Sequence, residues 1–488
     1  MSIDTHHLSS RIFSLLPHRS TSNIKHIPPQ IATPFASSDE RITDPQLATL
    51  QITVEEKNTI FQQTTFQGLS NKQEGFLHAL WNLSFVHSHP LVQLRTTLVK
   101  LYNSFPIQLR LFGFTCNINA NETLNSSATI IMFAQKNNGN VDLCFKMWQG
   151  CDNALYHTKD LRACAKYLLE GLKFNKPFAR NVYIGIAPVR SVSQDKISCG
   201  KLIWFPSFLS RWRIERRRQE YVLVMRRLDQ SWRLDHQLHT DDMKTKGAMD
   251  LLAKEIARMH KQLKPSHNAS GNGASILNKL KLNETEFNAA LEELSAQKWP
   301  APFDKNKYKF INSIMQEAYK NCAYHFTQRY ESGYVRRCHG DLKATNLWIY
   351  QNSKKGQREL LALDCVDFKA DFCHIDILSD VAMLAIDLEM RLTRWSDTYE
   401  DKKNGRKLTN HFLYTYLKEA TAKGDSIWLL LEYYMTEKAM VCAFMSIRYD
   451  ELPTLGEKYL DVAFAHAQRL QRRLKLLPAK TRQLVHSR

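Results

Sequence analysis

Residues 338–350 read Cys338-His339-Gly340-Asp341-Leu342-Lys343-Ala344-Thr345-Asn346-Leu347-Trp348-Ile349-Tyr350, and this stretch decides the fold. Within it, His339, Asp341 and Asn346 form the pattern His-x-Asp-x-x-x-x-Asn. Phosphoryl transfer from ATP needs few protein groups: a carboxylate that orients the attacking hydroxyl, oxygen ligands for Mg²⁺, and a cation on the phosphates. The pattern predicts that Asp341 faces the acceptor hydroxyl and that Asn346 binds the metal, while His339 supports the loop from behind.

A second metal ligand is expected at Asp364. The apolar run Leu360–Leu363 predicts a strand that ends directly before this carboxylate. Mg²⁺ prefers hard oxygen ligands, and one or two carboxylates suffice because substrate phosphates and waters complete its coordination shell. A carboxylate at a strand end makes the loop pattern much more specific than its three residues alone.

Longer segments give the sequence a resemblance to a known group. His339–Asn346 with Asp364, and the continuations Leu363–Lys369 and His374–Glu389, resemble the aminoglycoside phosphotransferase-like branch of the kinase superfamily. The sequence is most similar to the phosphotransferase half of the bacterial bifunctional aminoglycoside phosphotransferase/ATP-binding proteins, over roughly residues 120–450. The resemblance implies an α+β, two-lobed protein-kinase-like (aminoglycoside phosphotransferase-like) fold, with a small β-rich N-lobe and a helical C-lobe.

The resemblance also implies roles for single residues. Lys146 matches the lysine that holds the ATP phosphates, and Glu170 matches its ion-pair partner. Met225 to Leu228 match the hinge between the lobes, which holds adenine by its backbone. Asp380 matches an aspartate at a helix start that hydrogen-bonds the catalytic loop.

The sequence departs from the family pattern at three places. The family's second half has a phosphate-binding loop, and no G-x-x-x-x-G-K-[ST] pattern occurs here, so we expect the first half only. The segment that would cover the nucleotide, residues 122–127, has no glycine. Lys343 stands where the family commonly has His. Serine/threonine protein kinases have a lysine there, near the transferred phosphate, so we expect Lys343 to act beside Asp341.

Composition and periodicity divide the chain into segments. Residues 1–50 are expected to be a disordered N-terminal tail, with an organelle-targeting segment as the alternative. Residues 51–119 carry a helical pattern and are expected to form an N-terminal extension. The kinase-like N-lobe is placed at 120–225 and the C-lobe at 226–450, followed by a basic C-terminal helix and tail at 451–488, which we expect to dock on the body.

The hydrophobic pattern predicts the individual elements. Expected strands are 129–134, 141–147, 182–189 and 221–225, with a hairpin joining the first two. Expected helices are 161–172, 242–263, 304–329, 376–395, 408–421, 426–447 and 456–477.

The charge and the cysteine content limit the possible partners and the cellular compartment of the protein. Lys and Arg number 67 against 48 acids, a net charge of +19 that favours anionic partners without choosing among them. The most basic run, 211–220, is expected to be a solvated hairpin edge rather than a nucleic-acid or lipid patch. The ten cysteines have no CxxC spacing, so we expect buried, reduced thiols in a cytoplasmic protein. No apolar run approaches the roughly 18 residues of a membrane span.

Three functions are compatible with these residues. The first is an ATP- and Mg²⁺-dependent phosphotransferase that phosphorylates a hydroxyl of a small molecule. The second is a catalytically weak pseudokinase that serves as a binding or scaffold module, which the glycine-free segment favours. A protein kinase comes third, because only 15 residues separate Asp364 from Asp380 and leave little room for a peptide platform. The oligomeric state and the identity of the acceptor stay open.

An acidic segment suggests what the acceptor carries. Residues 370–390 contain five acids and no Lys or Arg: Asp371, Asp376, Asp380, Asp387 and Glu389. Clustered carboxylates raise the local concentration of cations. We therefore expect Asp371 and Asp376 to face the acceptor cleft and to favour a hydroxyl compound with an amine. The alternative is that core arginines such as Arg391 balance these acids.

Overall fold

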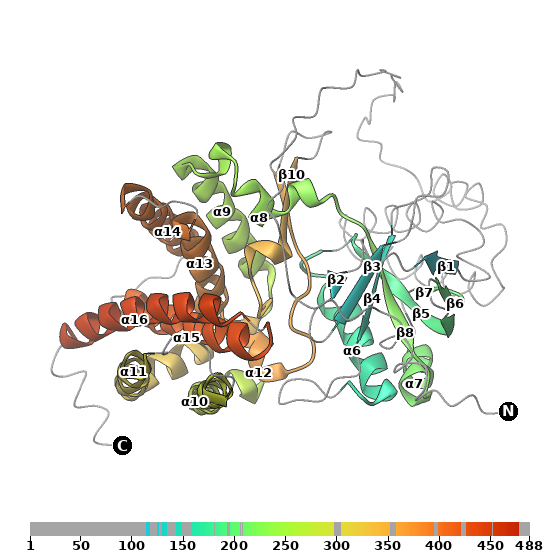
Figure 1. The fold of residues 1–488 in the computed structure, drawn as a ribbon, viewed down its shortest axis with the longest axis horizontal. Coiled ribbons are helices and arrows are strands. Elements are labelled where there is room, and N and C mark those ends of the chain that lie inside the picture. Colours follow the sequence, from blue (N-terminus) through green and yellow to red (C-terminus); the bar gives the residue numbers. More distant parts are fainter. Residues whose placement is uncertain are drawn as a thin grey trace.

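A computed structural model gives the fold of the chain. It describes residues 114–117, 124–125, 129–133, 143–148, 158–179, 181–192, 196–204, 206, 208–296, 304–351, 358–394, 399–420, 426–450 and 452–477. Two lobes lie side by side, one built on an antiparallel sheet and the other on helices (Figure 1). The predicted two-lobed, kinase-like α+β fold is confirmed. The predicted N-terminal tail and most of the predicted helical extension lie outside the described residues.

The sheet lobe contains eight strands, all paired antiparallel in the order β1-β6-β5-β8-β4-β3-β2, with β7 on β5. The strands are β1 (Phe114–Asn117), β2 (Leu124–Asn125), β3 (Thr129–Phe133), β4 (Leu143–Trp148), β5 (Tyr183–Val192), β6 (Lys196–Cys199), β7 (Ile203–Trp204) and β8 (Tyr221–Arg226). The predicted domain boundary at 119/120 is wrong, because β1 already pairs with β6 and belongs to the sheet.

The predicted hairpin is formed by β3 and β4, with Ile131 opposite Lys146. Side chains alternate between the two faces of a strand. Phe145 of β4 packs in the core on one face, whereas Trp148 packs with the helix on the other. Lys146 lies two residues before Trp148 and therefore shares its face of the strand. The hydrophobic alternation of β4 thus directs the lysine toward the helix side of the sheet.

Two helices cover that face of the sheet, α6 (Leu161–Phe174) and α7 (Phe208–Arg216) (Figure 1). The side chain of Asp160 caps the start of α6, and the helix ends before Pro177, as its sequence predicts. The prediction of a hairpin edge at the basic run is wrong, because its first residues form α7. Ile214 packs into the sheet core, and the guanidinium of Arg216 lies 4.2 Å from the ring centroid of Trp212.

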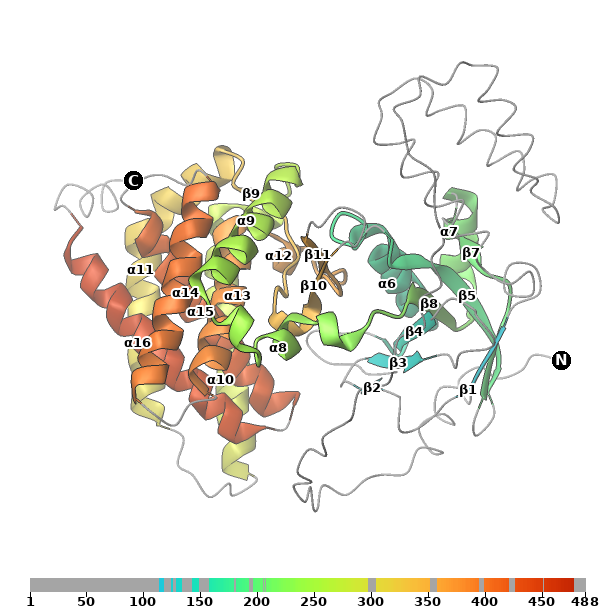
Figure 2. The ribbon, with the colours of Figure 1, turned by 90° about the horizontal axis from the view of Figure 1, so that it is seen from above.

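The chain crosses from β8 to the helical lobe through short helical turns, η1 (Gln230–Trp232) and α8 (Leu234–Gln237) (Figure 2). The helical lobe contains η2 (Asp241–Met243), α9 (Lys246–Gln262), η3 (Ala269–Gly271), α10 (Gly273–Ala296), α11 (Lys305–Glu331), α12 (Ala370–Cys373), α13 (Ile377–Arg394), α14 (Tyr399–Glu419), α15 (Ile427–Arg448) and α16 (Pro453–Lys475). Two small antiparallel ladders face the sheet lobe: β9 (Val335–Arg337) with β12 (His374–Asp376), and β10 (Leu347–Gln351) with β11 (Arg358–Ala362).

Helix α15 is at the centre of the helical lobe and is buried nearly all round. Helix α16 packs along it and buries an apolar stripe that includes Leu460, Ala467 and Leu470. The predicted docking of the C-terminal helix on the body is therefore confirmed. No helix among the described residues is both long and apolar enough to cross a membrane. The eight cysteines whose side chains the structure describes are free and buried.

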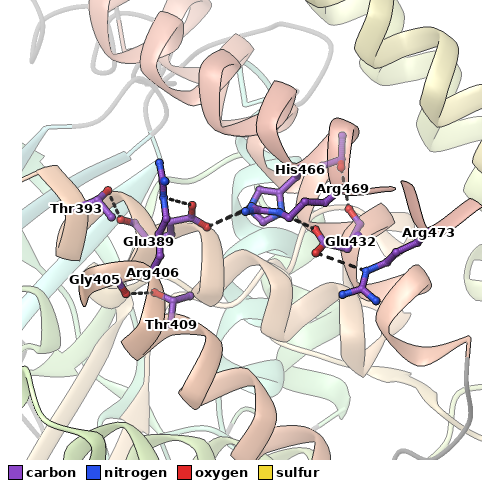
Figure 3. Close-up of polar contacts among 10 residues, drawn as sticks. Glu389, Thr393, Gly405, Arg406, Thr409, Glu432, His466, Arg469 and Arg473 are labelled. Carbon is purple, nitrogen blue, oxygen red and sulfur yellow. Dashed lines mark hydrogen bonds and ion pairs between the residues drawn. The ribbon is translucent and has the colours of Figure 1, made fainter. Parts of the chain in front are cut away.

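A buried charged cluster joins four helices of this lobe (Figure 3). The imidazole of His466 on α16 lies between Glu389 of α13 and Glu432 of α15, at N–O distances of 3.0 and 2.7 Å. Arg406 of α14 and Arg473 of α16 approach the same two carboxylates at 3.7 and 3.8 Å. Glu389 of the predicted acidic segment is thereby occupied inside the fold.

Candidate active site

The catalytic loop lies between β9 and β10 and is held by the start of α13. The carboxylate of Asp380 accepts the backbone N–H groups of His339 and Gly340 at 3.0 and 2.9 Å, which confirms its predicted contact. Gly340 has a φ of 85°, and a Cβ there would meet the carbonyl oxygen of Phe372 at 2.6 Å. Only glycine fits this position, so the chain can turn sharply into Asp341.

His339 supports the loop from inside the protein. Its side chain is fully buried, and burial lowers its pKa, so the ring is neutral at physiological pH. The backbone N–H of Asp341 donates to Nδ1 at 3.4 Å, and Nε2 donates to the carbonyl oxygen of Leu363 at 2.9 Å. His339 therefore ties the catalytic loop to the residue before Asp364.

Asp341, Lys343 and Asn346 are in direct contact. The ammonium of Lys343 lies 2.8 Å from Oδ1 of Asp341, and Nδ2 of Asn346 donates to Oδ2 at 3.1 Å. Burial would raise the pKa of Asp341, but Lys343 and Asn346 hold it below its usual value, so the carboxylate is ionised at neutral pH. Since the amide of Asn346 uses its nitrogen here, its oxygen is the atom that can bind a metal.

Asp364 lies beside this loop, after β11. Its φ is 64°, a left-handed conformation in which its N–H donates to the hydroxyl oxygen of Tyr183 at 2.8 Å. Its carboxylate forms an ion pair with the ammonium of Lys146, which crosses from the sheet lobe. Burial would lower the pKa of Lys146, but Asp364 and Asp367 raise it, so the lysine stays charged.

Asp367 is a site residue that sequence reasoning missed. Its carboxylate lies against Gly171 of α6, where an added Cβ would meet Oδ2 at 2.5 Å. Burial raises the pKa of Asp367 to about 7, and the nearby Asp364 adds to the rise while Lys146 opposes it. The spacing Asp-x-x-Asp from 364 to 367 is the signal that could have identified this second carboxylate.

Glu170 is not brought onto Lys146. Within the described part of the chain no ion pair joins these two residues, and Lys146 pairs with Asp364 instead. Glu170 is half-buried, and burial raises its pKa while Lys166 and Arg337 oppose the rise. The acid next to α6 that raises the pKa of Lys146 is Asp367.

The predicted hinge lies where the chain leaves β8. Met225 is paired in the sheet with both Cys144 and Tyr183, and its side chain is buried in the core. Leu228 packs partly against the same core. Met225 is therefore part of the sheet, and the adenine contact of Met225 to Leu228 stays a prediction.

One cavity of about 240 Å³ is lined by Lys146, Asp341, Lys343, Asp364 and Asp367, whereas Asn346, Glu170 and Met225 are not among its lining residues. Lys146, Asp341, Lys343 and Asp364 line one part of it, and α10 and α15 contribute Lys279, Asn283, Glu437 and Lys438 to the other part. Asp371 also lines the cavity, as predicted.

The rest of the acidic segment points elsewhere. The prediction for Asp376 is wrong, since its buried carboxylate pairs with Arg329, with Nη2 to Oδ1 at 2.8 Å. Arg391 balances Asp387, as the alternative reading proposed.

The residues present fit a magnesium ion. Two carboxylates, Asp364 and Asp367, and the amide oxygen of Asn346 are the hard donors that this ion takes, and substrate phosphates can supply the rest. A different cluster, His260, Cys338 and Asp380, also has ligand-type atoms close together. Its carboxylate accepts two loop N–H groups, and His260 hydrogen-bonds Asp380 and Tyr416, so that cluster has a structural role.

Comparisons with known proteins give distant relatives. No family model matches the chain. Uncharacterized proteins of Mycobacterium bovis and Mycobacterium tuberculosis are 24% identical over 267 residues, which are 53% of this chain. The match spans 47% of those proteins, so the chain corresponds to about half the length of these curated relatives.

Solved structures that resemble the chain include small-molecule kinases and a phosphotransferase. An ethanolamine kinase of Plasmodium vivax has a TM-score of 0.38 and 12% identity over 82% of this chain and 95% of that one. A choline kinase of Cryptosporidium parvum has a TM-score of 0.40 and 14% identity, and the match covers 73% of this chain and 91% of that one. An aminoglycoside 2'-phosphotransferase in complex with GDP has a TM-score of 0.37 and 13% identity, and the match covers 77% of this chain and 97% of that one. At these TM-scores the likeness is distant, so the chain's own strand order and loop contacts carry the fold assignment.

Proposed function

We propose that the chain is an ATP- and Mg²⁺-dependent phosphotransferase that phosphorylates a hydroxyl group of a small molecule. The observation that supports this best is the single cavity lined by Lys146, Asp341 and Asp364. These residues come from three separate segments, and they are the cation, the hydroxyl-orienting carboxylate and the metal-binding carboxylate that phosphoryl transfer needs.

Each residue has a defined role in this proposal. Asp341, ionised at neutral pH, accepts a hydrogen bond from the acceptor hydroxyl and takes its proton. Lys343 stays charged and lies next to the transferred phosphoryl group. Asn346 and Asp364, with Asp367, would hold Mg²⁺, which supplies positive charge to the phosphates when bound. Lys146 binds the phosphates once its present partner, Asp364, turns to the metal.

The acceptor would bind at the α10 and α15 end of the cavity. Asp371 is the acid of the acidic segment that lines this end, and it can receive an amine. Lys279 lies close enough to Asp371 for the two charges to interact, and burial lowers the pKa of Lys279 to about 8. Lys438 is 3.5 Å from Glu437. Because both signs of charge are present, we propose a compact hydroxyl compound with an amine, rather than a polycation.

The pseudokinase alternative makes a different prediction. A scaffold needs nucleotide binding at most, and has no use for a charged Asp341 in contact with Lys343. The described residues include Asp341, Asn346, Asp364 and Lys146, which favours the enzyme, while Glu170, the fifth residue expected in this set, does not pair with Lys146.

The decisive experiment is a screen of fractionated metabolite extracts with γ-labelled ATP and Mg²⁺. Wild type should transfer label to a small molecule, and Asp341→Asn should reduce transfer at least about tenfold, since general-base groups contribute 10²–10⁴. The affinity of Asp341→Asn for ATP should stay within about twofold of wild type, because the carboxylate acts on the acceptor. ATP binding by wild type without transfer to any fraction would support the scaffold alternative.

A further inference from the structure

One part of the active-site cavity has an apolar wall. Leu282 of α10, Phe372 of α12 and Val441 of α15 line it, so the wall is assembled from three separate elements. Each of these side chains is only partly buried. Leu282 and Phe372 are not among the residues that pack into the hydrophobic clusters of the described chain. Their apolar surface therefore faces the cavity, where a ligand can cover it.

Two buried sulfur-containing side chains extend this apolar surface. Met383 of α13 and Cys442 of α15 also line the cavity, and their sulfur atoms are 3.8 Å apart. Burial raises the pKa of Cys442 to about 12, so its thiol is uncharged. An uncharged cysteine behaves as a small apolar group, and methionine adapts to ligands of irregular shape.

The apolar wall adjoins the catalytic loop. A Cβ on Gly340 would meet the carbonyl oxygen of Phe372 at 2.6 Å and Cγ2 of Val366 at 2.9 Å. Gly340 directly precedes Asp341 in the chain, and Asp371 directly precedes Phe372. A molecule whose hydroxyl is at Asp341 and whose amine is at Asp371 therefore has apolar protein surface next to it.

Several charged groups at this end of the cavity already have partners within the protein. Glu286 of α10 pairs with Arg448 and accepts a hydrogen bond from the hydroxyl of Tyr449 at 3.2 Å. Lys438 lies 3.5 Å from Glu437. Charges that are paired in this way offer less to a ligand than their number suggests, which leaves the apolar wall as a large part of the surface that a ligand would contact.

We infer that the acceptor is an amino alcohol with an apolar substituent next to its amine. This inference rests on the proposed phosphotransfer for the hydroxyl and the amine, and it adds the third group of the substrate. The apolar substituent contacts Leu282, Phe372 and Val441, while the amine is at Asp371. The polar and apolar parts of the substrate are thereby held by different walls of one cavity.

Isothermal titration of the full chain, with and without Mg·ADP, tests the inference. The probes are ethanolamine, 2-amino-2-phenylethanol and 2-amino-1,3-propanediol, which share a hydroxyl and an amine and differ only in the group beside the amine. We expect the phenyl compound to bind at least about tenfold more tightly than the other two. A fully buried phenyl group contributes more than the 1.4 kcal/mol that tenfold requires. Its binding should also have the most negative heat-capacity change, the mark of apolar burial.

Variants locate the apolar wall. Leu282→Gln should reduce the preference for the phenyl compound over ethanolamine at least about fivefold, while the Kd for ethanolamine stays within about twofold of wild type. Leu277→Gln is the matched control, because Leu277 is a partly buried leucine of the same helix that does not line the cavity. Val441→Thr keeps the shape of its side chain and guards against misfolding of the first variant. It should reduce the preference in the same direction.

Three results would overturn the inference: equal affinity for the three probes, a preference that Leu282→Gln leaves unchanged, and absence of binding by the phenyl compound. Labelled ATP separates this inference from the proposed function. Transfer of label to ethanolamine as readily as to the phenyl compound would overturn the apolar substituent and keep the phosphotransfer. Tight, Leu282-dependent binding of the phenyl compound without any transfer would support the apolar wall and count against the phosphotransfer.

Discussion

Lys146 and Asp364 form an ion pair, and this pair governs how the site must respond to ATP. The lysine side chain is only 9% exposed, whereas the carboxylate is 48% exposed. A buried lysine needs a partner, because a buried unpaired charge is strongly unfavourable. Phosphates can replace Asp364 as that partner only if another cation receives the carboxylate. Nucleotide binding and metal binding are therefore expected to be coupled.

This coupling gives a thermal-shift prediction for Asp364→Asn. Mg·ATP should stabilise wild type by about 2.7 kcal/mol at a free ligand concentration of 100 Kd. ATP without Mg²⁺ should stabilise it much less. In Asp364→Asn, the Mg²⁺-dependent part of the increase should be largely lost, measured against the variant's own Tm without ligand. Asp461→Asn, an exposed acid paired with Lys307, is the control. An unchanged Mg²⁺-dependent shift in Asp364→Asn would refute the metal assignment.

The acceptor end of the cavity allows a matched pair of substitutions. If the acceptor carries an amine, Asp371→Asn should raise its KM about fivefold, the effect of roughly 1 kcal/mol for a partly exposed ion pair. Lys279→Met should leave that KM unchanged or lower it, because the ammonium repels an amine. The effect of Asp371→Asn should diminish at high salt. A rise in KM for Lys279→Met alone would show that the acceptor is an anion.

Sequence patterns predicted the residues of the catalytic loop better than its partners from other segments. His339, Asp341 and Asn346 lie within one short loop, so their spacing alone brings them together. Glu170 is matched to Lys146 only through the family resemblance. Which carboxylate reaches the lysine depends on tertiary packing: Lys146 pairs with Asp364, and the small Gly171 leaves room for the carboxylate of Asp367 nearby. Such a choice depends on the fit between two segments and is not encoded in either one.

At the scale of elements, periodicity succeeded where one face of an element is apolar. It predicted α6 and the hairpin of β3 and β4, but α10 was missed. Its apolar residues, including Ile276, Leu280 and Phe287, are separated by polar ones and follow a Gly- and Asn-rich segment typical of a loop. α7 was misread because its arginines mask a short helix in which Ile214 provides the buried contact. Elements with a weak apolar stripe need tertiary contacts to define them.

The cluster around His466 makes stability depend on pH in a defined direction. Burial would lower the pKa of His466, but Glu389 and Glu432 raise it above 6.5. Its contribution is therefore fully present below pH 6.5 and lost as pH rises through the raised value. Burial would raise the pKa of both glutamates, but His466 and the neighbouring arginines together lower it from 4.5, so their contribution is lost in acid. The window of greatest stabilisation lies between about pH 4.5 and 6.5.

The substitution His466→Gln tests this window. At pH 5.5 the variant should lose about 3 kcal/mol of unfolding free energy, the lower range for breaking a buried ion pair. The loss should shrink as pH increases above neutrality, measured by urea unfolding at pH 5.5, 7.5 and 9. His325→Gln offers a contrast. Burial lowers the pKa of His325, so this histidine should destabilise the fold in acid, and its replacement should raise the free energy of unfolding there. A pH-independent loss for His466→Gln would contradict the charged cluster.

For the whole molecule, the order of elements predicted two lobes, while the contacts that join them could not be read from the sequence. Asn175 follows α6 in the sheet lobe and is 1% exposed. Its Oδ1 accepts the backbone N–H of Cys365 at 2.9 Å, and its Nδ2 donates to the carbonyl oxygen of Gly171 at 3.0 Å. An asparagine after a helix is read locally as a helix end. Here it also fixes the residue next to Asp364, across the boundary between the lobes.

Asn175→Ala should therefore weaken both the fold and the site. The buried N–H of Cys365 would lose its partner, which costs about 1–3 kcal/mol, so the Tm should fall by several degrees. The Kd for Mg·ATP should rise as well, because the amide next to Asp364 would no longer be held against α6. Asn321→Ala is the matched control: Nδ2 of Asn321 makes the same kind of bond to a carbonyl four residues earlier, at 2.9 Å, but on an exposed helix surface. That control should change the free energy of unfolding by less than about 0.5 kcal/mol and leave the Kd unchanged. If Asn175→Ala lowered the Tm without affecting Mg·ATP, Asn175 would stabilise the lobe boundary but play no part in positioning Asp364.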